Sequence, residues 1–172
     1  LQPVVLQIGT AAGTLAAIAT RENISPSKVS VRQVQKAILD AGGYLLPYLD
    51  VPKTNKYFKT YQRIGATGIL KGEGRNVGWT NQTWLRTDTL LLSTELDQLK
   101  EIYPNMTYQL PTDTVALTIN DAINMIENIA MTHDIKAENI KVLVNHILKD
   151  NKAIVYNNSK NITRGGFAIL VD

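Results

Sequence analysis

The sequence contains no cysteine, two histidines and only 6% aromatic residues. Without cysteine the chain can form neither disulfides nor a thiolate metal site, and it has no thiol nucleophile. His133 and His146 belong to different predicted helical segments, and we expect structural or surface roles for both. No HExxH, GxSxG or phosphate-loop pattern occurs, and residues 71–75 (KGEGR) predict a turn because no GKS or GKT ending follows. These absences argue against a hydrolase or a metalloenzyme.

Neither sign of charge predominates, since 18 Lys and Arg stand against 15 Asp and Glu and the formal net charge is +3. The basic residues are scattered singly, so nucleic acid is not an expected partner. Judged by its apolar runs, the sequence predicts no membrane span, which would need about 20 residues. Leu1-Gln2-Pro3 carries neither an initiator Met nor the charged start of a signal peptide, and we expect the chain to be a fragment.

What the sequence does contain is helical periodicity, in a chain of 172 residues of which 44% are hydrophobic. Small residues dominate positions 8–19, which predict a tightly packed N-terminal helix. Ser30 with Gln33 and Thr118 with Asp121 form capping boxes, and Thr163 is a further helix cap. The predicted fold is all-α, with two three-helix repeats at residues 30–102 and 118–172 plus the N-terminal helix. We divide the chain into residues 1–28, 29–110 and 111–172.

Little strand is expected, with only residues 69–70 and 154–155 as plausible extended pieces. Residues 72–88, rich in Gly, Asn and Thr, predict a long loop that contains Trp79 and Trp84. The favoured interpretation is that both tryptophans fold back over an aromatic helix face formed by Tyr57, Phe58 and Tyr61. The alternative is that these aromatic side chains form a sugar-stacking platform or a patch that binds a partner protein.

Two stretches of the chain resemble one known family. Residues 8–17 (IGTAAGTLAA) are similar to the helix that closes the FAD-binding region of bacterial FAD-dependent oxidoreductases. Residues 50–52 (DVP), 57–58 (YF), 62–72 (QRIGATGILKG) and 79–84 (WTNQTW) resemble the tail that follows the flavin domain in that family.

This resemblance implies that the chain is a C-terminal accessory helical domain of an FAD-dependent oxidoreductase. The residues that would pack against the flavin end of FAD are Gly9, Thr10, Ala11, Ala12 and Gly13. Because the sequence has no GxGxxG, the chain by itself is expected to be non-catalytic and without cofactor. Its partner would be an upstream flavin domain, and without that domain the N-terminal helix is expected to self-associate.

A second resemblance points to a different function. Residues 50–52, Tyr57, residues 68–72 (GILKG) and residues 162–168 (ITRGGFA) are similar to S-layer homology modules, which bind cell-wall polysaccharide. In that case Arg164 would contact an anionic sugar, with Trp79 and Trp84 as further ligand-binding residues. The implied alternative is a non-catalytic module for envelope glycan. For the chain under either resemblance, a bacterial origin and a periplasmic or cell-envelope location are expected.

Overall fold

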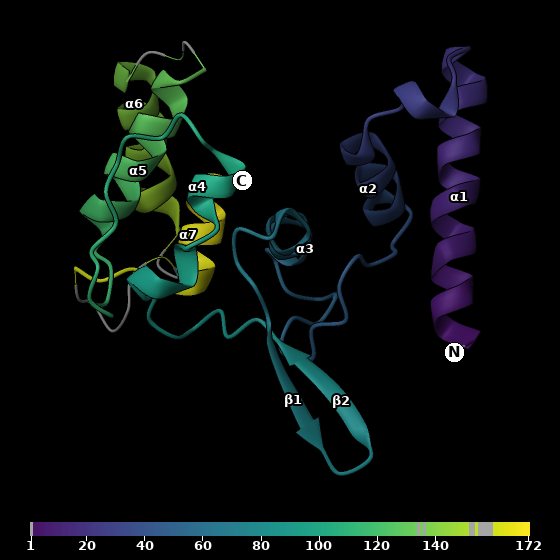
Figure 1. The fold of residues 1–172 in the computed structure, drawn as a ribbon, viewed down its shortest axis with the longest axis horizontal. Helices are drawn as coiled ribbons and strands as arrows, with labels where there is room; N and C mark the ends of the chain where they lie inside the picture. Colours follow the sequence, from purple (N-terminus) through teal and green to yellow (C-terminus); the bar gives the residue numbers. More distant parts are fainter. Residues whose placement is uncertain (1, 134, 136, 152–153, 155–159) are drawn as a thin grey trace. The chain divides into compact units, whose positions relative to one another are not determined.

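The structure, a computed structural model, describes residues 2–133, 135, 137–151, 154 and 160–172. Over these residues the chain is mostly helical, with a single two-stranded sheet (Figure 1), as the sequence predicted. The elements are, in chain order, α1 (Gln2–Glu22), η1 (Pro26–Lys28, 3-10), α2 (Val31–Asp40), α3 (Phe58–Thr67), β1 (Glu73–Val77), β2 (Thr80–Trp84), η2 (Ser93–Leu96, 3-10), α4 (Leu99–Ile102), α5 (Ile119–Met131), α6 (Ala137–Asp150) and α7 (Arg164–Val171).

The chain divides into two compact units, Leu1–Leu46 and Pro47–Asp172. The boundary between them lies between α2 and α3, whereas the boundaries predicted from the sequence follow residues 28 and 110. The helices predicted for residues 30–102 are therefore shared between both units, and each unit is described by itself below.

The first unit is a helical hairpin in which α1 packs on η1 and α2. Its small core consists of Ile18, Ala19 and Val29, with Leu15, Ile24, Val34 and Ala37 packed around them. The predicted capping box at the start of α2 is confirmed: Arg32 N–H donates to Ser30 Oγ at 3.2 Å, and Ser30 N–H donates to Gln33 Oε1 at 3.2 Å. The predicted start of α1 near residue 8 is wrong, since the helix runs from Gln2. Pro3 is compatible with it because the first turn needs no donor from that nitrogen.

The predicted long loop over residues 72–88 is also wrong. Residues 73–84 form an antiparallel hairpin in which Val77 pairs with Thr80, leaving Gly78 and Trp79 as a two-residue turn. Gly78 has φ +57°, a backbone conformation that favours glycine and fits the tight turns joining hairpin strands. Leu49 N–H donates to Thr83 O at 2.9 Å and thereby joins a distant segment to β2.

Neither of the two predicted extended pieces forms a strand in the described part of the chain. Ile69 and Leu70 form a buried bend, and Ile154 lies in a 3-10 turn, while residue 155 falls outside the described residues. Extended backbone instead occurs as isolated bridges. Leu91 N–H donates to Ile162 O at 3.1 Å, and Leu117 N–H donates to Leu91 O at 2.9 Å.

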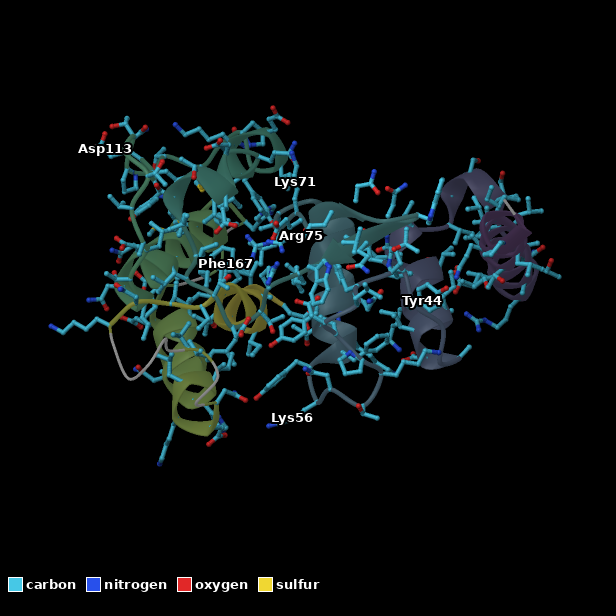
Figure 2. The ribbon with its side chains drawn as sticks, turned by 90° about the horizontal axis from the view of Figure 1, so that it is seen from below. Tyr44, Lys56, Lys71, Arg75, Asp113 and Phe167 are labelled. Carbon is cyan, nitrogen blue, oxygen red and sulfur yellow. The ribbon has the colours of Figure 1, made fainter. Side chains whose placement is uncertain are left out.

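The second unit packs α3 against α7 and α5 against α6. Phe167 of α7 is almost fully buried among these helices (Figure 2). The predicted caps hold: Asp121 N–H donates to Thr118 Oγ1, and Gly166 N–H donates to Thr163 Oγ1. A Cβ at Gly166 would lie 2.4 Å from Ile154 O, so only glycine lets α7 approach this backbone. The first residue of α7, Arg164, is thereby held deep inside the unit.

Candidate functional site

The residues assigned to FAD contact lie in the middle of α1 and not at its start. The amides of Gly9, Thr10, Ala11, Ala12 and Gly13 are inside a continuous helix from Gln2 to Glu22, where they bond to helix carbonyls. Their N–H groups are therefore paired within the helix, and a contact of these five residues with FAD stays a prediction. Gly9 and Gly13 are exposed, and nothing lies within 4 Å of a Cβ built on either. These positions offer a bare helix flank to a neighbouring surface.

The N-terminal half of α1 exposes apolar side chains in several directions. Val4, Val5, Leu6 and Ile8 are all exposed, Leu6 by 72%. At about 100° per residue these four side chains point to different sides of the helix. No charged residue occurs in residues 1–20, and the hydroxyl of Thr10 donates to Leu6 O at 2.9 Å. A helix that is apolar all round is typical of a buried element.

By length and composition, α1 also qualifies as a membrane-crossing helix. The segment Pro3–Glu22 contains an 18-residue window with a mean hydropathy of 1.4, and among the described residues it is the one helix long and apolar enough to cross a membrane. The expectation of no such segment overlooked the fact that threonine and glycine interrupt the apolar runs without adding charge. A single N-terminal helix of this kind is weak evidence for a membrane, because interior helices and signal sequences have the same composition.

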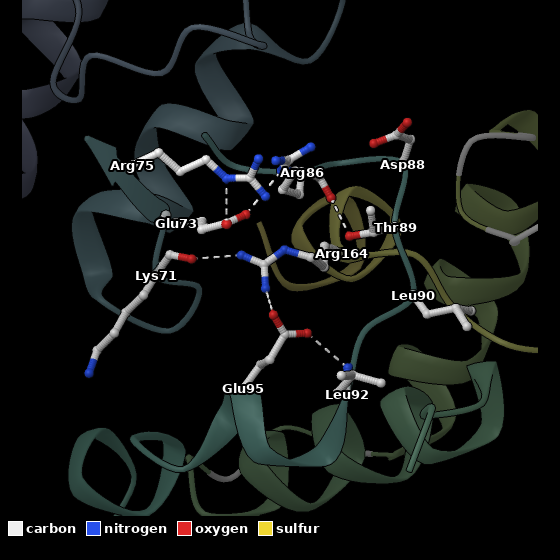
Figure 3. Close-up of a pocket in the computed structure, with 11 residues that line it drawn as sticks. Lys71, Glu73, Arg75, Arg86, Asp88, Thr89, Leu90, Leu92, Glu95 and Arg164 are labelled. Atoms are coloured by element: carbon white, nitrogen blue, oxygen red, sulfur yellow. Dashed lines mark hydrogen bonds and ion pairs between the residues drawn. The ribbon is translucent and has the colours of Figure 1, made fainter. Parts of the chain in front are cut away.

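The second candidate region lies in residues 47–172, around Arg164 (Figure 3). Arg164 is only 5% exposed. Its Nε donates to Leu85 O at 2.8 Å, one terminal nitrogen donates to Lys71 O at 2.6 Å, and the other pairs with Glu95. The second carboxylate oxygen of Glu95 accepts from Leu92 N–H at 2.9 Å. The guanidinium predicted to contact a sugar thus holds the hairpin ends and η2 together.

Asp50 fixes the backbone beside this arginine. Its two carboxylate oxygens accept from Leu85 N–H at 2.8 Å and from Arg86 N–H at 2.6 Å. Burial lowers the pKa of Arg164, and Tyr48, Asp50 and Glu73 oppose the shift. Arginine titrates so far above neutrality that the side chain stays charged.

Two further groups near this region have shifted pKa values. Burial raises the pKa of Tyr48 to about 12, with Arg164 lowering it and Asp50 raising it. Hydrogen bonds from Arg75, and secondarily from Arg86, hold the pKa of the exposed Glu73 below its usual value. These shifts leave Tyr48 neutral, Glu73 ionised and Arg164 cationic at neutral pH.

The structure separates the two tryptophans. Trp79 is fully exposed at the hairpin turn, so the prediction that it folds back over the aromatic helix face is wrong. Trp84 is half-buried at the other end of β2, where its Nε1–H donates to Gln82 Oε1 at 3.2 Å and the Arg86 guanidinium lies 5.2 Å from the ring centroid. Five residues of strand span about 17 Å, so the pair does not form one flat platform.

The histidines form no site in the described part of the chain. The ring of His133 makes an edge contact with the ring of Tyr103. Nδ1 of the exposed His146 lies 3.1 Å from Oδ2 of Asp150. No group of three potential metal ligands occurs among the described residues. Four residues that the structure places around Arg164 were assigned no role from the sequence, namely Asp50, Glu73, Arg86 and Glu95. The aspartate of the DVP motif was noticed, but nothing in the sequence indicates that its partners are backbone amides 35 and 36 residues away.

Comparison with known proteins gives one result. Residues 1–38 match the family model described as FAD dependent oxidoreductase, and this match supports membership of an FAD-dependent oxidoreductase family. No curated protein and no solved structure matches the chain. The matched segment covers α1, η1 and most of α2, and so lies entirely within the first compact unit.

Replacing Arg164 tests its structural role. Arg164→Met leaves Glu95 and the carbonyls of Leu85 and Lys71 without their cationic donor, and we expect the second unit to lose about 3–5 kcal/mol of unfolding free energy. Urea denaturation followed by tryptophan fluorescence measures this, because both tryptophans lie in that unit. The control is Arg75→Met, whose exposed ion pair with Glu73 should leave the unfolding midpoint almost unchanged. Equal effects of the two substitutions would contradict the structural role.

The tryptophans should differ in the same assay. Trp84→Ala removes a half-buried ring and should lower the unfolding free energy by about 1–2 kcal/mol. Trp79→Ala removes a ring in contact with solvent, and the midpoint should stay unchanged. A comparable loss of stability in both variants would show that Trp79 is packed.

Proposed function

We propose that the chain is part of an FAD-dependent oxidoreductase. In this proposal residues 1–46 complete the FAD-binding module, and residues 47–172 form an accessory helical domain that takes no part in the chemistry. The match of residues 1–38 to the family supports the first assignment, since it coincides with one compact unit. The structural use of Arg164, whose guanidinium donates to three oxygens of the same unit, supports the second.

The observation that carries the proposal is the surface of α1. Its N-terminal half exposes Val4, Val5, Leu6 and Ile8 on different sides, and charge is absent from residues 1–20. Apolar surface of this extent is covered in a native protein, and all-round apolarity requires cover on more than one side. A protein interior that surrounds the helix fulfils this requirement, whereas a single flat contact does not.

The residues present fit the flavin end of the cofactor and not its pyrophosphate. Gly9 and Gly13 leave open space where a side chain would stand, which permits close approach of a planar ring or of another backbone. FAD, when bound, supplies hydride and electron transfer. The pyrophosphate needs a glycine-rich turn at a helix N-terminus, and GxGxxG is absent from the 172 residues. We therefore assign pyrophosphate binding to other residues of the protein.

The alternative, a glycan-binding module, has one observation in its favour. Trp79 presents its whole ring to solvent, as sugar-stacking tryptophans do. Arg164 adds no specific support for a sugar, because three of its five N–H groups donate to protein oxygens and the remaining two suit any anion. The flavoenzyme proposal also accounts for the exposed helix, for which glycan binding offers no explanation.

Cofactor retention tests the proposal. The 172-residue chain, mixed with FAD and desalted, should keep no stoichiometric flavin absorbance. A longer form of the protein that includes residues before Leu1 should keep it. In that longer form Gly13→Leu places a bulky side chain on the bare flank and should weaken FAD retention roughly tenfold, the effect of overpacking by about 1–3 kcal/mol.

Trp79→Ala in the longer form is the control and should retain FAD fully, because its ring lies in the other unit. A yellow 172-residue protein after desalting would contradict the division of the cofactor site. Unchanged FAD retention in Gly13→Leu would contradict the role of α1.

A further inference from the structure

A charged groove runs along the base of the hairpin in the second unit, with a volume of about 930 Å³ (Figure 3). Four cationic side chains line it, against three carboxylates. The cations are Lys71, Arg75, Arg86 and Arg164, and the carboxylates are Glu73, Asp88 and Glu95. The groove thus carries a local excess of positive charge, supplied mainly by guanidinium groups.

Glu73 holds two of the guanidinium groups next to each other. Arg75 Nε donates to one of its carboxylate oxygens at 2.6 Å, and Arg86 Nε donates to the other at 3.1 Å. Both contacts use the Nε–H of the arginine, so the terminal nitrogens of the two guanidinium groups remain for a ligand. One carboxylate therefore orients two cations and neutralises only one of them.

Arg164 contributes a third guanidinium, at the buried side of the groove. Three of its five N–H groups donate to Leu85 O, Lys71 O and Glu95. Each terminal nitrogen keeps one further N–H, and the residue lines the groove. Because protein oxygens fix its position, this guanidinium is preorganised and loses little conformational entropy when it binds an anion.

The backbone of Arg86 indicates that its side chain is placed here at a cost. Arg86 has φ +59°, in the left-handed region that disfavours non-glycine residues. Asp50 accepts its N–H at 2.6 Å, and its carbonyl accepts from Thr89 Oγ1 at 2.9 Å, so the conformation is fixed from both sides. If the position had to form only a turn, glycine would adopt this conformation without strain. We therefore infer that an arginine stands here for the sake of its guanidinium group.

We propose that this groove binds a phosphoryl group carried by a small ligand. The three guanidinium groups that line the groove keep N–H groups for the several acceptor oxygens of a tetrahedral dianion, and Arg is the side chain that pairs with phosphate in a bidentate manner. A monoanionic carboxylate would use only part of this donor set. The site lies in the second unit and does not depend on the proposed flavin function.

Isothermal titration of the 172-residue chain with inorganic phosphate, at constant ionic strength, tests the proposal. We expect one phosphate per chain and weaker binding of acetate. Arg86→Gly should weaken phosphate binding about tenfold by removing a charge-assisted contact, yet should not lower the unfolding midpoint, because glycine relieves the backbone strain. The matched control is Asn23→Gly, at the other described non-glycine residue with positive φ, 52°, in the first unit.

Asn23→Gly should leave phosphate binding unchanged. No measurable phosphate binding, equal binding of acetate, or unchanged binding in Arg86→Gly would each overturn the proposal. A loss of binding in Arg86→Gly that is matched by an equal loss in Asn23→Gly would overturn it as well. Because FAD is absent from this titration, its failure leaves the flavin proposal untouched.

Discussion

A buried guanidinium must find acceptor oxygens inside the protein, and in residues 47–172 Arg164 determines which segments meet. Its acceptors, Leu85, Lys71 and Glu95, lie 69 to 93 residues away along the chain. Leaving such a cation unpaired would cost several kcal/mol, so the hairpin ends and η2 are fixed relative to the start of α7. The same hydrogen bonds position the residues of the groove beside Arg164, because Glu73 and Arg86 lie at the hairpin ends that Arg164 holds.

The two units meet different physical requirements. The second unit buries its own apolar and charged groups, with Phe167 and Arg164 both inside it. Among its described residues the first buries five apolar ones, namely Ile18, Ala19, Val29, Ile38 and Leu39, and the N-terminal half of its helix α1 is uncharged and exposes apolar side chains. The family match falls on that first unit alone. This contrast supports the proposal that residues 47–172 are an accessory domain fused to a cofactor module.

Local interactions were predictable from the sequence, and distant ones were not. The caps at Ser30, Thr118 and Thr163 were found because a side chain bonds to backbone within three residues. The hairpin was missed because its strands are polar and lack alternation, and its turn depends on the positive φ of Gly78. Ligand contact by Arg164 was expected only from the resemblance to S-layer homology modules, and no sequence signal identifies the distant backbone carbonyls that accept its hydrogen bonds.

We propose that α1 is an interior helix of an FAD module. Because the sequence contains no cysteine, the solvent accessibility of α1 can be measured through a single introduced thiol. A single Gly13→Cys variant can be labelled with a thiol reagent in the 172-residue chain, with lipid vesicles added, and in a longer FAD-loaded form of the protein. The account predicts fast labelling in the first two cases and strong protection in the third. A Trp79→Cys control should remain reactive throughout. Protection by vesicles, or equal labelling with and without the FAD module, would contradict an interior position of α1 in that module.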